Sequence, residues 1–288
     1  MKYRHSYHAG NFADVHKHVT LLALLAALQR KDKGFLDFDS HAGRGRYELA
    51  AAGGEAGGAA EAAGGIGRFL GHEHRAEELR HYAALLARLR AARARPQHYP
   101  GSPLLAAAVL RAQDRGVFVE LQGAEAHSLS AALEAGAPQS APARLRVERG
   151  DGLKLLRAAL PPPERRALLF IDPPYEETRE EFPRVAAAVQ DGLRRFATGV
   201  FAVWYPIKER RVSAAWHADW SREVLVPTLV SELWLYPPDS RVSLNGSGVL
   251  IVNPPWQIAE RMRDWLPELA TTLGAGGSGG TDVRMLSQ

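Results

Sequence analysis

One short segment combines the residue types needed for chemistry on an amine. Asp172-Pro173-Pro174-Tyr175 directly follows an apolar run at residues 167–171, which predicts a buried strand, and ligands collect at the carboxyl ends of parallel strands. A carboxylate and a rigidly held proline carbonyl can accept both hydrogens of a planar exocyclic amine such as adenine N6, whose lone pair is otherwise delocalised into the ring. The tyrosine ring offers a face on which the base could stack. We therefore predict Asp172, Pro173 and Tyr175 as catalytic residues of an amine methyltransferase; the alternative is a proline turn that closes a strand.

A second segment, Asn253-Pro254-Pro255-Trp256, fits the same looser pattern of an amide or acid, two prolines and an aromatic ring. It follows the apolar run at residues 249–252, the last strand that we predict for the main sheet. In a methyltransferase built on an α/β sheet we expect that strand to be antiparallel, so that its end lies at the edge away from the cofactor. We therefore expect a structural role for this segment, with Trp256 packed at the sheet edge.

Acidic residues stand at the ends of the first three predicted strands. A glycine-containing turn, residues 39–45, comes at the end of the first strand, and such turns let the backbone approach a ligand closely. Glu120 ends the second strand, where a carboxylate would hold both hydroxyls of a ribose, and Asp151-Gly152 follow the third, where an acidic turn would meet an adenine. The alternatives are a surface acid at Glu120 and a helix N-cap at Asp151. With Asp172 after the fourth strand, this order is the one expected of an S-adenosylmethionine-dependent methyltransferase.

The N-terminal head, residues 1–11, is dense in histidine and aromatic side chains. A metal site is conceivable among the early histidines, which are His5, His8, His16, His18 and His41. However, histidines two positions apart lie on different faces of a helix, and no acid–histidine spacing here matches a zinc pattern, so we expect no metal. We expect instead a lid or substrate-contact segment, with Tyr3 and Arg4 near nucleic acid and Lys17 or His18 near the cofactor. The alternative is an N-terminus that is merely ordered.

The elements that must position these residues alternate regularly along the chain. Helical periodicity predicts helices over 12–29, 73–94 and 257–273, the first of them capped by Asn11. Strand-like runs lie at residues 35–39, 117–121, 145–148, 167–171, 199–205, 228–235 and 249–252. Strands that alternate with helical segments indicate an α/β protein with a largely parallel, doubly wound sheet.

The spacing of the acids predicts an insertion in this fold. In a simple dinucleotide-binding fold the acid that holds the ribose follows the glycine turn by about 20 residues, whereas here the next strand that ends in an acid is 117–120. We therefore predict a helical insertion at residues 48–98 in a Rossmann-like domain made of residues 1–47 and 99–273. Within it, residues 50–67 are almost entirely alanine and glycine and are weakly specified. Residues 274–288 begin glycine- and serine-rich, and we expect a disordered tail.

The composition excludes several classes of function. The chain of 288 residues has no cysteine, which excludes disulfides, thiolate metal sites, iron–sulfur clusters and cysteine nucleophiles. Its 36 basic and 32 acidic residues give a net charge of +4, which permits a polyanionic partner without requiring one. The early apolar run at residues 19–28 is far shorter than the roughly 20 residues that span a bilayer, and no cleavage signal closes it. We therefore expect a cytoplasmic protein.

Distinctive motifs spread from the first residues to about position 256. They are Tyr3-Arg4-His5-Ser6-Tyr7-His8-Ala9-Gly10-Asn11, Asp14-Val15 with Lys17-His18, Ser40-His41-Ala42-Gly43, Tyr99-Pro100-Gly101-Ser102-Pro103, Asp172-Pro173-Pro174-Tyr175, Trp204-Tyr205-Pro206 and Asn253-Pro254-Pro255-Trp256. With these motifs the chain resembles the RlmJ family of bacterial 23S ribosomal RNA adenine-N6 methyltransferases.

This resemblance implies a Rossmann-like class I methyltransferase that uses S-adenosylmethionine to methylate adenine 2030 of 23S rRNA. It implies Asp172 as the catalytic acceptor and Tyr3 as a contact to the RNA. By position, it also implies a set of cofactor contacts: Lys17, His18, His41, Ser102, Glu120, Asp151 and Gly152. We expect a monomer that acts without a metal or a membrane.

Three other functions compete with this interpretation. A DNA adenine methyltransferase would share the Asp-Pro-Pro-Tyr segment, but the only candidate for a target-recognition region is the small insertion. A non-catalytic RNA-binding protein on the same fold would not need Asp172 or the cofactor-side acids. A nicotinamide-dependent oxidoreductase is the least favoured, since hydride transfer does not require Asp-Pro-Pro-Tyr.

Overall fold

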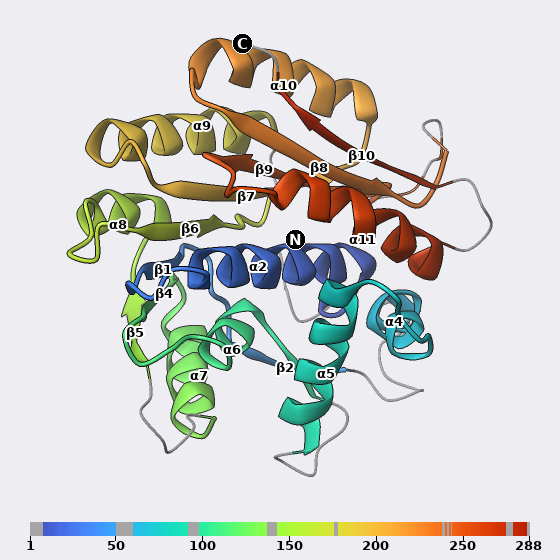
Figure 1. Ribbon diagram of the computed structural model, residues 1–288, viewed down its shortest axis with the longest axis horizontal. Coiled ribbons are helices and arrows are strands. Elements are labelled where there is room, and N and C mark those ends of the chain that lie inside the picture. Colours follow the sequence, from blue (N-terminus) through green and yellow to red (C-terminus); the bar gives the residue numbers. More distant parts are fainter. Residues whose placement is uncertain are drawn as a thin grey trace.

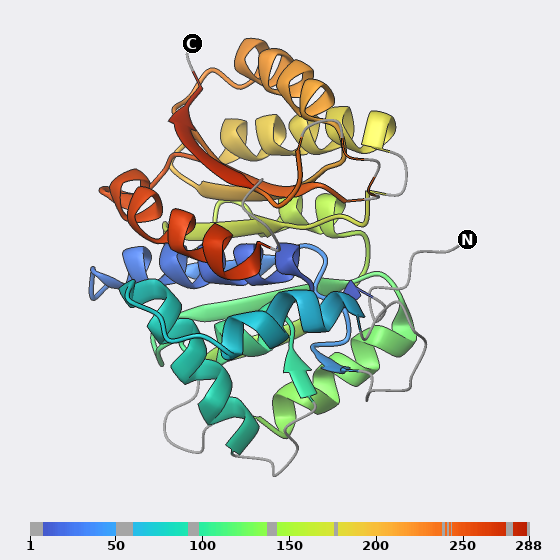
Figure 2. The same cartoon turned by 90° about the vertical axis from the view of Figure 1, so that its right-hand side faces the viewer.

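A single sheet with helices on both faces forms the body of the protein (Figure 1). The computed structural model describes residues 8–49, 60–91, 98–136, 143–175, 178–237, 240, 242, 244–274 and 279–286. Figures 1 and 2 agree on the layers: α8, α9 and α10 lie on one side of the strands, and α2 and α11 lie on the other. No helix in the described ranges is long and apolar enough to cross a membrane.

The main sheet has eight strands in the order β10-β8-β9-β7-β6-β1-β4-β5. Strands β1, β4, β5, β6 and β7 are parallel, whereas β9 runs antiparallel to both of its neighbours, β7 and β8. The strand bounds are β1 Leu36–Asp39, β4 Arg115–Glu120, β5 Arg144–Arg149, β6 Ala167–Ile171, β7 Val200–Ile207, β8 Thr228–Trp234, β9 Gly246–Val252 and β10 Gly280–Met285. This arrangement confirms the expected α/β class, the largely parallel sheet and the antiparallel strand before Asn253.

The central strands are apolar because helices cover both of their faces. Every residue of β1 and β6 is buried, which is the continuous apolar pattern of a doubly covered parallel sheet. The helices that accompany the sheet are α2 Phe12–Gln29, α6 Ser102–Ala107, α7 Gly123–Glu134, α8 Gly152–Ala159, α9 Thr178–Arg195, α10 Arg210–Glu223 and α11 Ile258–Leu273.

Helix α2 lies in the middle of the molecule rather than on its surface. The side chain of Asn11 caps it by accepting a hydrogen bond from the Asp14 amide at 3.0 Å, as the sequence predicts. The helix packs on β9 on one side and on α5, α6 and α11 on others, so it is buried almost all round. Its polar residues Asp14, His16, Lys17 and His18 are therefore buried and need partners inside the protein.

The helices of the insertion lie between two short strands, β2 Arg46–Glu48 and β3 His98–Pro100, which pair antiparallel. Residues 60–70 are helical, with a π-helical turn at Ala63–Gly67 followed by α4 Arg68–Leu70, and α5 covers Glu77–Ala91. Helix α5 begins at Glu77 rather than at the predicted residue 73, and Glu268 of α11 accepts the amides of Arg75 and Ala76 just before this start. The predicted end at residue 94 lies outside the described ranges. Residues 50–59, where the alanine–glycine stretch begins, lie outside the described ranges.

The expectation of a disordered tail at residues 274–288 is wrong for Gly280–Met285. These residues form β10, which pairs antiparallel with β8 and thereby covers what would otherwise be the edge of the sheet. The glycine-rich residues before this strand resemble a flexible linker, so composition alone hides a strand whose main-chain partners come from far away in the sequence.

Candidate active site

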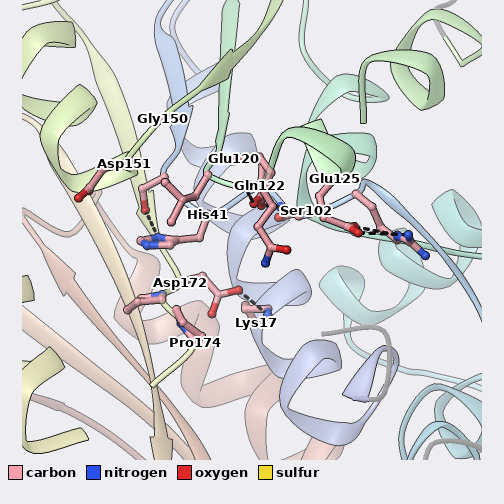
Figure 3. A pocket seen from close by; sticks show the side chains of 18 of the residues that line it. Lys17, His41, Ser102, Glu120, Gln122, Glu125, Gly150, Asp151, Asp172 and Pro174 are labelled. Carbon is pink, nitrogen blue, oxygen red and sulfur yellow. Dashed lines mark hydrogen bonds and ion pairs between the residues drawn. The ribbon is translucent and has the colours of Figure 1, made fainter. Parts of the chain in front are cut away.

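The predicted cofactor residues meet in one cavity. A cavity of about 690 Å³ opens at the carboxyl ends of β1, β4, β5 and β6, the edge at which parallel sheets bind ligands (Figure 3). Tyr3 and Arg4, the predicted RNA contacts, lie outside the described residues. The sequence-predicted residues that line the cavity are Lys17, His18, His41, Ser102, Glu120, Asp151, Gly152, Asp172 and Pro173.

Glu120 is held in a fixed orientation at the end of β4. Its Oε2 accepts the Gly43 amide at 3.0 Å, and its Oε1 accepts the Gln122 amide at 2.7 Å. Gly43 has a φ of +62°, and a Cβ there would lie 2.2 Å from the hydroxyl oxygen of Tyr47, so the turn requires glycine. The carboxylate is thus a preoriented acceptor facing the cavity rather than a mobile surface acid (Figure 3).

Asp151 is the N-cap of α8 and also lines the cavity. Its Oδ1 accepts the amides of Leu153 and Lys154, at 3.1 and 3.3 Å, and its Oδ2 pairs with Arg184 at 3.0 Å. The capping role that we considered as an alternative is therefore present. Beside it, a Cβ on Gly152 would lie 1.8 Å from the carbonyl oxygen of Ser40, so glycine is needed for this close approach of α8 to the turn after β1.

Ser102 is supported by Asp39, the buried acid that ends the first strand. The Ser102 hydroxyl donates to Oδ2 of Asp39 at 2.6 Å, and the His41 amide donates to Oδ1 at 3.1 Å. Burial raises the pKa of Asp39 to about 7, although these two hydrogen bonds oppose the rise. The available signal was an acid as the last residue of the first strand. Asp39 orients Ser102 from behind the cavity wall.

Two histidines reach the cavity from different elements. His18 of α2 makes a 2.8 Å hydrogen bond from Nδ1 to the hydroxyl of Tyr99, which lies 2.9 Å from the hydroxyl of Tyr82 in α5. His41 makes a 2.7 Å contact from Nδ1 to the Ser40 hydroxyl, and burial lowers the pKa of His41 to about 4. His41 is therefore neutral at physiological pH, so one of its ring nitrogens can donate a hydrogen bond and the other can accept one.

Lys17 links the catalytic candidate Asp172 to the start of α2. Its Nζ lies 2.8 Å from Oδ1 of Asp14 and 2.6 Å from Oδ2 of Asp172 (Figure 3). Burial lowers the pKa of Lys17, but the two carboxylates outweigh burial and raise the pKa well above its usual value. The ammonium group is therefore charged, and it fixes the Asp172 carboxylate at the cavity wall.

Tyr175 lies beside a second cavity, with its ring packed against other aromatic side chains. Its side chain is only 2% exposed, and the ring lies edge-on to Phe182 and Trp204, with centroids 5.5 and 5.7 Å away. It borders a second cavity rather than the one that holds Asp172 and Glu120. The sequence pattern could not reveal this aromatic packing around the ring.

The Asn253-Pro254-Pro255-Trp256 segment lies away from this cavity, as expected. Asn253 follows the antiparallel strand β9, has a φ of +52°, and donates from Nδ2 to the carbonyls of Ala197 and Gly199, both at 2.8 Å. Its role is thus to tie two loops together. The expectation that Trp256 packs at the sheet edge is wrong, because this side chain is 80% exposed and no layer covers it.

Among the described residues, the early histidines have different partners, and His5 lies outside the described ranges. His8 contacts Glu61, whereas His16 lies in the core between Ser231 and Ser247. Within the described part of the chain, no group of three histidine, aspartate or glutamate residues could hold a metal ion.

Comparison with known proteins finds relatives along the whole chain. Residues 32–286 match the family described as ribosomal RNA large subunit methyltransferase D, RlmJ. The chain is 35% identical to ribosomal RNA large subunit methyltransferase J of Haemophilus influenzae, covering 100% of this chain and 99% of the relative. It is 36% identical to the Escherichia coli protein of the same name, over 98% of each. A crystal structure of a Legionella pneumophila protein superposes with a TM-score of 0.83 at 31% identity, covering 98% of this chain and 99% of that one.

Proposed function

The chain belongs to the RlmJ family of ribosomal RNA large subunit methyltransferases and has the class I methyltransferase fold, and we propose that it methylates the N6 amino group of one adenine in 23S rRNA. The methyl donor in this proposal is S-adenosylmethionine. The observation that carries the proposal is the position of Asp172, whose carboxylate lies in the wall of the same cavity that every predicted cofactor residue lines.

The residues of the cavity fit this cofactor. The preoriented carboxylate of Glu120 suits two adjacent ribose hydroxyls, because each hydroxyl can donate to an oxygen that the backbone already holds in place. The close approach at Gly152 and the neutral ring of His41 suit the adenine end. The remaining part of the cofactor, its charged amino-acid end, would contact Ser102, His18 and Lys17. When bound, S-adenosylmethionine supplies a methyl group on a positively charged sulfur.

Asp172 and Pro173 prepare the acceptor nitrogen in this proposal. Lys17 occupies Oδ2 of Asp172, so an incoming amino group can donate one hydrogen to the other carboxylate oxygen. The second hydrogen goes to the carbonyl of Pro173, which two successive prolines keep rigid. Both bonds draw the nitrogen out of conjugation with the ring and expose its lone pair to the methyl group. After transfer, the nitrogen is positively charged, and it gives the proton bonded to Asp172 to that carboxylate, from which it passes to solvent.

Incubation of the purified protein with a labelled methyl donor tests this function. The expected result is label in 23S rRNA and none in DNA, with N6-methyladenosine as the labelled nucleoside after digestion. Mapping of N6-methyladenine in rRNA from a strain that lacks the protein should show one site unmodified, expected at adenine 2030. Label in DNA alone would favour a DNA adenine methyltransferase, and no label in either would favour a non-catalytic RNA-binding protein.

A further inference from the structure

Trp256 is an exposed aromatic side chain held by a rigid loop. The side chain is 80% exposed, whereas tryptophan is highly buried on average in folded proteins. Asn253 and Gln257, which flank the loop, have φ angles of +52° and +63°, a conformation that residues other than glycine rarely adopt. Between them, Pro254 and Pro255 fix two further φ angles. The loop therefore keeps a large ring in solvent, although its burial would be favourable.

This loop lies at the edge of the sheet opposite the cofactor cavity. Val252, the last residue of the antiparallel strand β9, pairs with Phe201 near the start of β7, and β7 is parallel to β6. Strand β6 has 5 residues at about 3.3 Å each, so the two edges lie about 17 Å apart along it. One helical turn of a duplex is on the order of 30 Å long. A folded RNA whose adenine lies in the active site is thus large enough to reach this edge.

The end of α2 places cations beside the loop. Arg30 donates from two guanidinium nitrogens to Oε1 of Gln257, at 3.4 and 3.3 Å, so it is adjacent to Trp256. It belongs to a group of exposed cations at the amino ends of β1 and β6, none of which has an ion-pair partner within the described part of the chain. They are Arg30, Lys31, Lys33 and Arg165. Two exposed acids, Asp32 and Glu260, lie in the same segments, so the cations are in excess.

Cations at a helix C-terminus can simply stabilise the helix, but two other arginines already do so here. Arg111, which pairs with Asp114, donates to the carbonyl of Gln29 at 3.1 Å, and Arg166 donates to that of Leu28 at 2.6 Å. Burial and the nearby charge of Arg111 lower the pKa of Arg166, so positive charges already repel one another in this region. The additional exposed cations therefore suit an anionic partner better than they suit the helix end.

We propose that Trp256 and the cations at the end of α2 form a second RNA contact, at which a segment of the substrate remote from the target adenine stacks one base on the indole and places phosphates against Arg30, Lys31 and Lys33. Cations beside an exposed aromatic ring are the combination that binds unpaired nucleotides. Aromatic anchors of protein interfaces sit instead in well-packed, desolvated pockets, whereas charged side chains surround this indole. The inference rests on the proposed function for the identity of the RNA.

Steady-state kinetics with a long and a short RNA test the stacking contact. Trp256→Ala should raise KM for 23S rRNA by about tenfold, as expected for the loss of one base–aromatic stack, and leave kcat unchanged. Trp256→Phe, the matched control, should keep a KM close to that of wild type. With a short RNA fragment that carries the target adenine but ends before the far edge of the sheet, all three proteins should have the same KM. The melting temperature of each variant verifies that it is folded.

A salt series tests the phosphate contacts separately. The double variant Lys31→Gln/Lys33→Gln should reduce the slope of log Kd for labelled 23S rRNA against log salt concentration by roughly two, because about one unit is lost with each phosphate contact. Lys31→Arg/Lys33→Arg keeps both charges and should keep the slope of wild type. Fluorescence anisotropy measures this binding without methyl transfer.

The results separate this inference from the function on which it rests. If wild type methylates rRNA while folded Trp256→Ala has a normal KM for 23S rRNA, the stacking contact is wrong and the methyltransferase function stands. An unchanged salt slope in the double glutamine variant overturns the phosphate contacts in the same way, and an equal rise of KM for the long and the short RNA overturns the remote contact. Normal kinetics on naked rRNA with reduced methylation of assembling ribosomal particles would assign the surface to a protein partner instead. If wild type methylates no RNA but its binding of 23S rRNA depends on Trp256, the surface is supported and the proposed reaction fails.

Discussion

At the scale of single residues, the proposed role of Asp172 depends on its ion pair with Lys17. Asp172 accepts a hydrogen bond from Lys17 before any substrate is present, and Lys17 keeps Asp14 as a second partner. Removing the Asp172 carboxylate therefore leaves no uncompensated buried ammonium group, which is the usual cause of severe destabilisation when a buried pair is broken. Substitutions at Asp172 should thus report on chemistry more than on folding.

Asp172→Ala should abolish methyl transfer and leave S-adenosylmethionine binding largely intact. Asp172→Asn should keep a trace of activity, because the amide oxygen can still accept one hydrogen from the amino group. Single-turnover methylation of rRNA measures the first effect and calorimetry the second. Near-normal turnover in the alanine variant would rule out the role given to this carboxylate.

Glu120→Ala should weaken S-adenosylmethionine binding by roughly tenfold or more, since each charge-assisted bond to a ribose hydroxyl is worth about 1.5–3 kcal/mol. The same carboxylate holds the Gly43 and Gln122 amides, so the melting temperature should fall as well. Glu120→Gln is the matched control, because its oxygen still accepts a hydrogen bond without the charge. An unchanged dissociation constant in the alanine variant would show that the ribose lies elsewhere.

At the scale of elements, the sequence predicts the helices and strands whose apolar residues follow a regular pattern. Apolar runs located every strand from β1 to β9 in the main sheet, and the residues that follow β1, β4, β5 and β6 lie in one cavity because these parallel strands end at the same edge. Contacts between distant elements were not predictable. The partners of β10, the aromatic layers around Tyr175 and the exposure of Trp256 all depend on which elements become neighbours, and no local pattern encodes that.

The inserted helix α5 contributes to the cofactor cavity through hydroxyl groups. His18 reaches the cavity while its Nδ1 bonds the Tyr99 hydroxyl, and Tyr82 of α5 bonds Tyr99 in turn. Tyr99→Phe should weaken S-adenosylmethionine binding several-fold, because a buried hydrogen bond that orients His18 is lost. Tyr82→Phe should have a smaller effect, since Tyr99 still reaches His18. Calorimetry checks both, and equal affinities in wild type and Tyr99→Phe would exclude this positioning role.

At the scale of the whole molecule, the last strand and helix α10 are joined by a partly buried polar cluster. Arg284 of β10 donates to Nδ1 of His217 at 3.0 Å, and Nε2 of His217 lies 2.9 Å from the Tyr205 hydroxyl. That hydroxyl donates to Glu232 at 2.9 Å, and Arg284 faces Glu232 at 3.6 Å and pairs with Asp282. The arrangement requires His217 to be neutral, with its proton on Nε2, because Nδ1 must accept from a guanidinium.

This requirement makes stability depend on pH in a defined direction. Burial and the nearby Arg284 charge lower the pKa of His217 from 6.5 to about 4. The unfolded chain therefore binds this proton more readily than the folded one, so His217 contributes no loss above pH 6.5 and a growing loss as the pH falls towards 4. The lowering of the His217 pKa corresponds to a loss of about 3 kcal/mol in the free energy of unfolding once the pH is below both pKa values. His16, whose pKa is about 3, acts in the same direction.

His217→Gln isolates one of these two contributions. The variant should be less stable than wild type at pH 7, because glutamine cannot reproduce both ring contacts, but its free energy of unfolding should fall less steeply between pH 6.5 and 4. Urea unfolding across this range measures both slopes, and His16, present in both proteins, cancels in the comparison. Parallel curves for wild type and variant would mean that His217 does not titrate on unfolding.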